Sequence, residues 1–98
     1  MSEITVAEVD VRRVRDQIVD VREDEEVVEG MIPGALHIPL GQLASRTAEL
    51  DRARPVVTVC RSGKRSARAA EELTAAGFQA DTMNGGMIAW RNAGLPTS

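Results

Sequence analysis

The sequence predicts an α/β fold with a mainly parallel central β-sheet and helices on both faces. Short β-branched runs alternate with segments of helical periodicity, so that strands and helices follow one another along the chain. Each parallel connection needs a crossover of a dozen or more residues, which the helical segments supply. A length of 98 residues without a repeat or linker indicates a single domain over residues 1–98.

Four segments carry the pattern of a strand. The two central strands are expected at Gln17–Val21 and Pro55–Val59, and the second is a continuous apolar run of the kind found in strands buried on both faces. Leu36–Leu40 is a weaker candidate because Pro39 interrupts it, and Gln79–Met83 is the fourth.

Four helices are expected between and after these strands. They are Glu23–Glu29, Leu43–Leu50, Ser62–Ala76 and Gly86–Asn92. The third has the clearest apolar face, and Gly77 should end it in the left-handed conformation. Such an ending folds Phe78 back onto Leu73.

The charge pattern favours a small anionic ligand. The net charge is -3, yet four of the twelve cationic residues lie within residues 61–68. A single basic spot on an acidic chain suits a small anion, whereas nucleic acid needs a wider basic face and, for single strands, aromatic platforms. No apolar run is long enough to span a membrane and Met1–Val9 lacks the features of a leader, so we expect a cytoplasmic protein without membrane contact.

The chain has one cysteine, Cys60. It has no partner for an internal disulfide and is insufficient for a zinc site. We expect neither a metal nor a cofactor. Any chemistry of this thiol must therefore be completed by a molecule from outside the chain.

The most informative segment is the loop that follows Pro55–Val59. Cys60 stands at the carboxyl end of that strand, where open α/β sheets bind ligands, and the loop leads into a helix whose first amide groups are unpaired. These dipoles, together with three nearby cations, are expected to favour thiolate over thiol. We therefore predict that Cys60 is a nucleophile held in a cradle of loop residues. The cradle comprises Arg61, Ser62, Gly63, Lys64 and Arg65.

The loop also restricts the reaction. No histidine, aspartate or glutamate occurs from Cys60 to Arg68, so the loop itself offers no general base and no acid for a leaving group. A leaving group that departs as a stable anion, such as sulfite from thiosulfate, fits this composition. The expected reaction is transfer of a sulfane sulfur from a small anionic donor to Cys60, and from there to cyanide or a thiol. A lone cysteine after a β-branched strand is, however, also typical of a small buried hydrophobic residue.

Four motifs occur in a familiar order. They are Asp20-Val21-Arg22, Gly30-Met31-Ile32-Pro33-Gly34-Ala35, Cys60-Arg61-Ser62-Gly63-Lys64-Arg65-Ser66 and Gly85-Gly86-Met87-Ile88-Ala89-Trp90. In these motifs the chain resembles a single-domain rhodanese, of the sulfurtransferase family, from about Ile4 to Pro96. The resemblance implies a rhodanese-like fold and a thiosulfate sulfurtransferase activity. It also implies that Cys60 becomes a persulfide and that Arg65 closes the loop around it.

The loop length and three departures bear on the substrate. Related phosphatases have a Cys-x5-Arg loop, whereas Cys60 to Arg65 is Cys-x4-Arg, a shorter ring that suits a sulfur atom. Met31 stands where the family commonly has histidine, and Val27 and Val28 stand where an aromatic residue is usual. Lys64 adds charge at the mouth of the loop, where the family often has a small polar residue.

Other polar residues are expected to support the loop without contacting substrate. Asp20 and Arg22 should hold neighbouring loops through an ion pair and hydrogen bonds, and Ser66 should act from just beyond the loop. His37 is expected to be structural or exposed, and Trp90 to cover the core. The acidic run Glu23–Glu26 should be a solvated helix start, with docking of a basic partner as the alternative.

Two other functions remain open at this point. One is a non-catalytic binding or regulatory module on the same scaffold. The other is a cysteine-dependent phosphatase or arsenate reductase, against which the short loop and the missing second cysteine argue.

Overall fold

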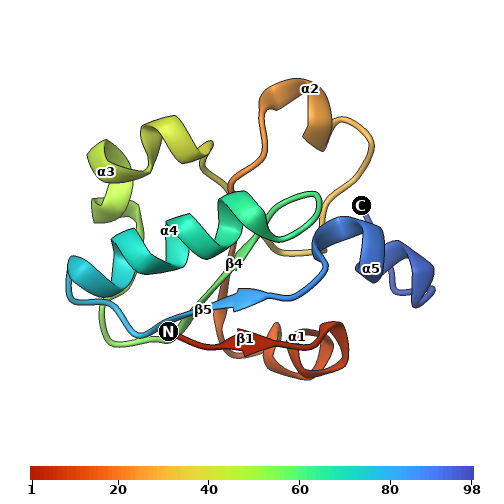
Figure 1. The fold of residues 1–98 in the computed structure, drawn as a ribbon, viewed down its shortest axis with the longest axis horizontal. Helices are drawn as coiled ribbons and strands as arrows, with labels where there is room; N and C mark the ends of the chain where they lie inside the picture. Colours follow the sequence, from red (N-terminus) through yellow and green to blue (C-terminus); the bar gives the residue numbers. More distant parts are fainter.

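The computed structural model, drawn in Figure 1, describes residues 1–98. Five parallel strands form one sheet of order β1-β5-β4-β2-β3. The strands are β1 (Glu3–Ile4), β2 (Gln17–Asp20), β3 (Leu36–His37), β4 (Val56–Val59) and β5 (Ala80–Met83). All four residues of β4 are buried, because β4 lies in the middle of the sheet and is covered on both faces. The predicted α/β class with a parallel sheet is therefore confirmed.

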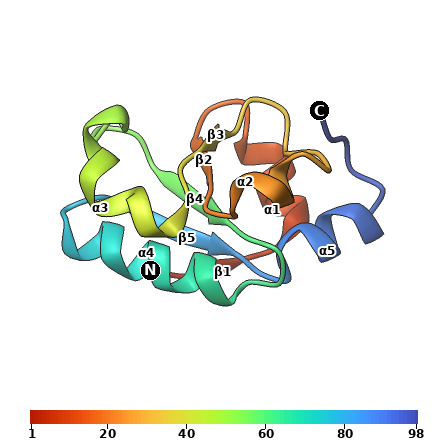
Figure 2. The same ribbon diagram turned by 90° about the horizontal axis from the view of Figure 1, so that it is seen from above.

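Helices pack on both faces of the sheet (Figure 2). They are α1 (Val6–Arg12), α2 (Asp24–Val27), α3 (Leu43–Arg46), α4 (Lys64–Ala75) and α5 (Gly86–Asn92), with 3-10 turns at Leu40–Gln42 and Thr47–Glu49. α3 and α4 supply one apolar core, and α1 and α5 supply the other. No helix has the length and apolar character needed to cross a membrane.

The alternation of side chains along β4 connects it to both cores. Val57 and Val59 pack in the cluster that contains Trp90 of α5, whereas Val56 and Cys60 pack in the cluster beneath α4. Successive residues of a strand point to opposite faces, so this pattern places the cysteine on the α4 side. The predicted role of Trp90 in the core is confirmed, since the residue is fully buried.

The N-terminal strand and helix were not predicted. β1 is only two residues long, and the exposed Val11 and Val14 obscure the apolar periodicity of the following segment. The helix is instead signalled by a capping box, in which the Thr5 hydroxyl accepts from the Glu8 amide and the Glu8 carboxylate accepts from the Thr5 amide. This Thr-x-x-Glu signature was the available clue.

Several predicted elements are shorter than expected. The third strand ends at His37 because Pro39, which has no amide hydrogen, leads into a 3-10 turn. The long third helix begins at Lys64 and ends as predicted, with Gly77 left-handed and the Phe78 amide donating to the Leu73 carbonyl at 2.9 Å. The predicted helix 43–50 splits into α3 and a 3-10 turn.

Candidate active site

The loop after β4 lies at the carboxyl edge of the sheet, between α2 and α5 (Figure 1). It runs from Cys60 to Gly63, and Gly63 is the N-cap of α4 with φ of +115°. This left-handed backbone favours glycine and turns the first amides of α4 back towards the cysteine.

The sulfur of Cys60 accepts hydrogen bonds within this loop. The Gly63 amide donates to Sγ at 3.0 Å, and the amides of Ser62 and Ser66 also bond the sulfur. The Ser66 hydroxyl lies 3.4 Å from Sγ. Burial raises the pKa of the Cys60 thiol, but the Ser66 hydroxyl and the three amides outweigh burial and hold the pKa below its ordinary value.

Cys60 is nevertheless only 1% exposed and belongs to the apolar core under α4. This burial is what a small hydrophobic residue would show. A sulfur surrounded by donated amide hydrogens is not what such a residue would show, because those amides would then have no charge to stabilise. The site therefore combines an anion-stabilising cradle with narrow access to the sulfur.

The start of α5 orients the loop peptides. The Met87 amide donates to the Cys60 carbonyl at 2.8 Å, and the Ile88 amide donates to the Arg61 carbonyl at 3.1 Å. In a trans peptide the N–H points opposite to the C=O, so these bonds turn the Arg61 and Ser62 amides away from α5. Gly86 permits this contact, because an added Cβ there would lie 2.6 Å from the Cys60 oxygen and closer still to the Arg61 carbonyl.

Two buried threonines support Ser66 from the sheet. The Thr82 hydroxyl of β5 donates to Ser66 Oγ at 2.8 Å, and the Thr58 hydroxyl of β4 donates to the Ser66 backbone carbonyl at 2.6 Å. Ser66 Oγ also lies 3.1 Å from the Gly63 carbonyl. These bonds to the side chain and the backbone of Ser66 hold its hydroxyl beside the Cys60 sulfur. The sequence alone places Ser66 only near the end of the loop.

The cations of the loop are arranged differently from expectation. The Arg65 guanidinium donates two hydrogen bonds to the Glu26 carboxylate of α2, with Nη1–Oε1 and Nη2–Oε2 distances of 2.6 and 2.8 Å. This pairing lowers the pKa of Glu26 to about 2. Arg61 and Lys64 are exposed and form no ion pair. The effects that lower the pKa of Cys60 come from the Ser66 hydroxyl and from amides, which agrees with the predicted role of the loop dipoles. None of the three predicted cations is among them.

The segment after β2 is tied down as the sequence predicted. Arg22, which is 2% exposed, donates to the Asp20 carboxylate, with an Nη2–Oδ2 distance of 2.7 Å. The same guanidinium donates to the carbonyls of Glu26 and Gly30, at 3.3 and 2.8 Å. The ring of His37 lies 2.7 Å from the Arg22 carbonyl and serves structure. These bonds hold α2 and the following turn over the loop.

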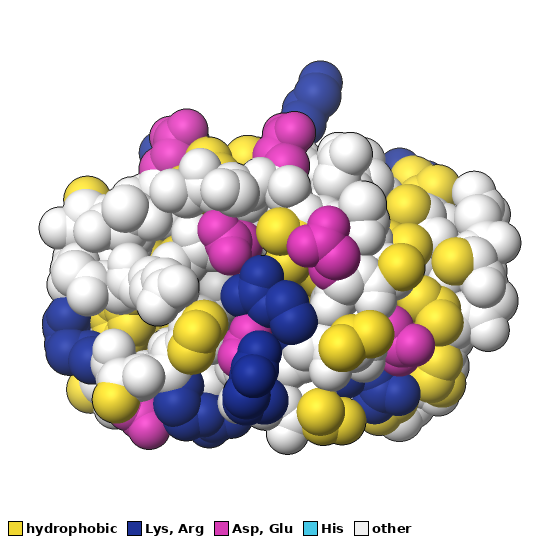
Figure 3. All heavy atoms as spheres, turned by 90° about the horizontal axis from the view of Figure 1, so that it is seen from below, with side chains coloured by type: hydrophobic (Ala, Val, Ile, Leu, Met, Phe, Trp, Pro, Cys, Tyr) yellow, Lys and Arg dark blue, Asp and Glu magenta, His cyan; other side chains and the backbone are white.

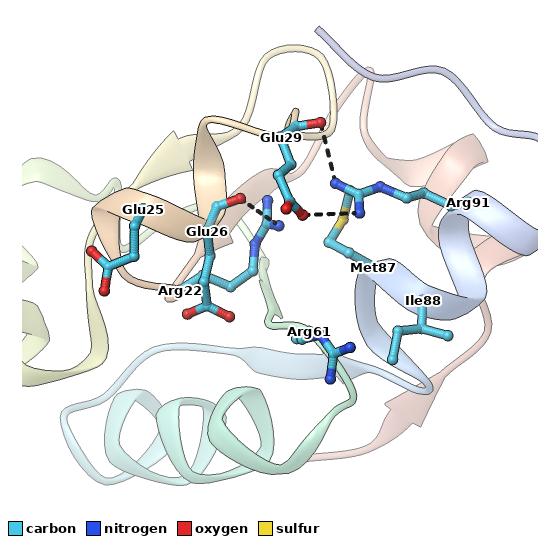
Figure 4. A pocket seen from close by; sticks show the side chains of 8 residues that line it. All are labelled: Arg22, Glu25, Glu26, Glu29, Arg61, Met87, Ile88 and Arg91. Carbon is cyan, nitrogen blue, oxygen red and sulfur yellow. Dashed lines mark hydrogen bonds and ion pairs between the residues drawn. The ribbon is translucent and has the colours of Figure 1, made fainter.

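A cavity of about 260 Å³ opens beside the loop, between the α2 segment and α5 (Figure 4). Its lining residues are Arg22, Glu25, Glu26, Glu29, Arg61, Met87, Ile88 and Arg91. Arg91 pairs with Glu29 at 3.6 Å, which leaves Arg61 as the cation of the lining without a carboxylate partner. Cys60 does not line the cavity, whereas the next residue, Arg61, does.

The residues around this centre that the sequence analysis left out are Glu26, Thr82 and Thr58. The sequence predicts that Glu26 belongs to a solvated helix start, whereas its carboxylate pairs with Arg65, 39 positions further along the sequence. The alternation of β4 could have placed Thr58 on the face of Cys60. The Thr82 contact depends on the register Thr58↔Thr82 between β4 and β5, for which the sequence carries no signal.

The three departures from the family pattern lie at different places. Met31 pairs through its backbone with Ser98, at 2.9 and 3.1 Å, and Val28, next to Val27, is exposed. Lys64 is exposed at the first position of α4. On the face drawn in Figure 3, several Lys and Arg side chains gather near the centre, and acidic and hydrophobic side chains surround them.

Comparisons with known proteins agree with this geometry. The family model of the rhodanese-like domain matches residues 5–93. A putative sulfurtransferase of Bacillus subtilis, YtwF, is 44% identical over 79 residues, which cover 81% of this chain and 77% of the relative. The thiosulfate sulfurtransferase GlpE of Shewanella oneidensis is 37% identical over 78 residues, covering 79% and 77%.

Comparison with solved structures also finds rhodanese-related proteins. The crystal structure of a rhodanese-related protein from Thermoplasma volcanium superposes with a TM-score of 0.95 at 28% identity, covering 100% of this chain and 98% of that one. The match of the family model to nearly the whole chain, the named sulfurtransferases among its relatives and the shared fold lead to one conclusion: the chain belongs to the rhodanese-like domain family.

Proposed function

We propose that residues 1–98 act as one rhodanese-like domain, a sulfurtransferase that carries a sulfane sulfur on Cys60 as a persulfide. The observation that supports this most strongly is the sulfur at the centre of donated hydrogen bonds, which lower the pKa of Cys60 despite its burial. The thiolate, rather than the thiol, is the nucleophile in such reactions.

The first half-reaction needs no proton from the protein. The Cys60 thiolate attacks the outer sulfur of thiosulfate, an S–S bond forms to Sγ, and the S–S bond of thiosulfate breaks with its electron pair leaving on sulfite. The persulfide then carries the negative charge on its outer sulfur, one bond away from the Sγ to which the Gly63 and Ser62 amides donate in the unloaded protein. Such donors stabilise negative charge that develops beside them. A site without a general acid suffices because sulfite is a stable anion.

The second half-reaction returns the thiolate. Cyanide attacks the outer sulfur of the persulfide, a C–S bond forms, and the electron pair of the broken S–S bond returns to Sγ, giving thiocyanate. A thiolate acceptor follows the same course and becomes a persulfide itself. Neither half-reaction requires a cofactor.

We assign the binding of the anionic donor to Arg61 and the cavity beside it. Arg61 is exposed, unpaired and one residue from the nucleophile, so its charge is available to a small anion. Arg65 is less available, because Glu26 occupies its guanidinium. In this proposal Arg65 closes the loop structurally, while Arg61 and Lys64 attract the donor.

The burial of Cys60 supports one competing function. A cysteine that is 1% exposed within an apolar cluster is also compatible with a binding module that never reacts. The two functions differ in a single property, which is whether small sulfur donors reach the sulfur in the folded protein.

A donor panel read by intact mass separates these functions. The folded protein is incubated with thiosulfate, with polysulfide and with a persulfide of a small thiol, and cyanide is then added to measure thiocyanate. Because the chain has one cysteine, a mass increase of one sulfur atom reports Cys60 alone, and Cys60→Ser serves as the matched control.

We expect the adduct in the native protein, its absence in Cys60→Ser, and its loss on addition of cyanide. Absence of an adduct with every donor would reject the sulfurtransferase and favour the binding module. Turnover of an aryl phosphate without any sulfur adduct would instead favour the phosphatase.

A further inference from the structure

A chain of three hydroxyl and thiol groups runs from the sheet to the nucleophile. Thr82 Oγ1 lies 2.8 Å from Ser66 Oγ, and Ser66 Oγ lies 3.4 Å from Cys60 Sγ. Thr82 and Ser66 are both 1% exposed or less, so no water competes for these bonds. The chain ends at Thr82, whose hydroxyl has no other hydrogen-bond partner.

Ser66 has a single hydroxyl hydrogen and two possible acceptors for it. One acceptor is the Gly63 carbonyl, 3.1 Å away, and the other is Cys60 Sγ. When Cys60 is a thiol, its S–H donates to Ser66 Oγ and the serine donates to Gly63. When the thiol has lost its proton to solvent, the serine hydroxyl turns and donates to the sulfur.

The hydrogen bond from Thr82 stabilises the arrangement in which the Ser66 hydroxyl donates to the ionised sulfur. With Thr82 donating to Ser66 Oγ, the serine has an accepted bond in both states and its own hydrogen is free to turn to the sulfur. Without Thr82, Ser66 Oγ accepts a bond only from a protonated Cys60, so the thiol form is favoured.

We propose that Thr82 is a positioning residue, which directs the Ser66 hydroxyl onto the ionised sulfur of Cys60. The inference concerns the reactive group of the proposed function and therefore rests on it. Thr82 does not touch a substrate, and its effect is transmitted entirely through Ser66.

Charged groups around the loop are unchanged by any substitution at Thr82. They are Arg61, Lys64 and Arg65 on the loop and α4, Glu23 and Glu26 at α2, Asp20 at the end of β2, Arg22 just after it, and Arg91 with Glu29 at α5. Asp81, next to Thr82 on β5, pairs with Arg12. A change in the ionisation of Cys60 in a Thr82 variant is therefore a result of the hydrogen-bond chain.

The sheet supplies a matched control. Thr58 is the register partner of Thr82, is equally buried and faces the same helix, but its hydroxyl donates to the Ser66 backbone carbonyl. Thr82→Val and Thr58→Val make the same change of hydroxyl to methyl on adjacent strands. Only the first removes a bond to Ser66 Oγ.

The test is a pH titration of the thiolate absorbance in the ultraviolet, with Cys60→Ser subtracted as the blank. This measurement requires neither a sulfur donor nor access of a reagent to the sulfur, so it is independent of the sulfurtransferase activity. At a fixed pH below the midpoint we expect the thiolate-to-thiol ratio of Thr82→Val to fall between about twofold and tenfold, the effect of one buried neutral hydrogen bond. Thr58→Val should titrate like the native protein.

Two further variants isolate the hydroxyl if Thr82→Val does not fold. Thr82→Ser keeps the hydroxyl and Thr82→Ala removes it, while both lose the same methyl group. We expect Thr82→Ser to titrate like the native protein and Thr82→Ala to shift towards the thiol. An unchanged titration in Thr82→Val or Thr82→Ala, or an equal shift in Thr58→Val, would overturn the proposal.

Discussion

Gly86 is the point at which α5 touches the loop, and substituting it by alanine tests that contact. Gly86 has φ of +59°, and a Cβ added to it would overlap the Arg61 carbonyl and lie 2.6 Å from the Cys60 oxygen. These neighbours are backbone atoms of a loop that is hydrogen-bonded to α5 and to the Cys60 sulfur, so they cannot move aside as a flexible side chain would.

The magnitude follows from two separate costs. An alanine in the left-handed region costs about 1 kcal/mol relative to glycine. Overlap with packed backbone atoms adds about 1–3 kcal/mol. We therefore expect Gly86→Ala to lower the free energy of unfolding by about 3 kcal/mol. Displaced carbonyls of Cys60 and Arg61 would also rotate the loop amides off the sulfur and raise the pKa of Cys60.

Gly94 provides the matched control, because it has φ of +73° and no atom within 4 Å of an added Cβ. Gly94→Ala should lose only the conformational part, about 1 kcal/mol, and should leave the ionisation of Cys60 unchanged. Urea denaturation measures the first quantity and the pH dependence of thiolate absorbance measures the second. If the two variants agree within about 0.5 kcal/mol, the close approach of α5 to the loop does not constrain Gly86.

Three other substitutions have distinct expected outcomes. Glu26→Gln should lower the free energy of unfolding at neutral pH by about 1 kcal/mol. The fall in pKa from 4.5 to about 2 corresponds to roughly 3 kcal/mol, which solvent screening of a partly exposed pair reduces. Because the pKa of Glu26 is lower in the folded state, this stabilisation is present above pH 4.5 and is lost as the pH falls towards 2. Urea denaturation in which the native protein and Glu26→Gln still differ in free energy of unfolding near pH 2 would contradict this explanation. Arg61→Gln should slow loading by thiosulfate several-fold at low salt and less at high salt, measured by intact mass, and an effect no larger than that of Arg68→Gln would count against it. Trp90→Phe removes the 2.8 Å bond from Nε1 to the Pro96 carbonyl and leaves a cavity at a fully buried position, so it should cost about 2–3 kcal/mol in urea denaturation, with no change in the thiolate titration.

The elements that the sequence predicts well are those whose pattern is local. The continuous apolar run Val56–Val59 predicts a strand buried on both faces without reference to the rest of the chain. It also places Cys60 at the carboxyl edge of the sheet, where α/β proteins bind ligands. Gly77 and Phe78 encode the end of α4 within a few residues. The Ser62 and Gly63 amides, which bond the Cys60 sulfur, belong to one continuous loop and were therefore within reach of sequence reasoning. That the five predicted residues form a cradle for a substrate stays a prediction.

The features that escaped prediction depend on contacts between distant segments. The pairing of Glu26 with Arg65 requires α2 to lie over the loop, and the Thr82 bond to Ser66 requires the register of β5 against β4. The sequence predicts that the loop cations stabilise the thiolate together with the loop amides, because it gives no sign of a carboxylate that reaches the loop from another segment. Once α2 is placed, Arg65 meets a carboxylate at hydrogen-bond distance and neutral donors remain to stabilise the sulfur.

The state and accessibility of the Cys60 sulfur are tested most directly by its rate of alkylation at about pH 6, where an ordinary thiol is almost fully protonated. The folded protein and the urea-unfolded chain are treated with iodoacetamide, and the single cysteine is followed by intact mass. We predict faster modification of the folded protein, because its amides and the Ser66 hydroxyl lower the pKa of Cys60. A larger fraction of the sulfur is then thiolate than in the unfolded chain, and the proposed function requires that a small molecule reach it. A folded protein that stays unmodified while the unfolded chain reacts would show that Cys60 is a sealed core residue.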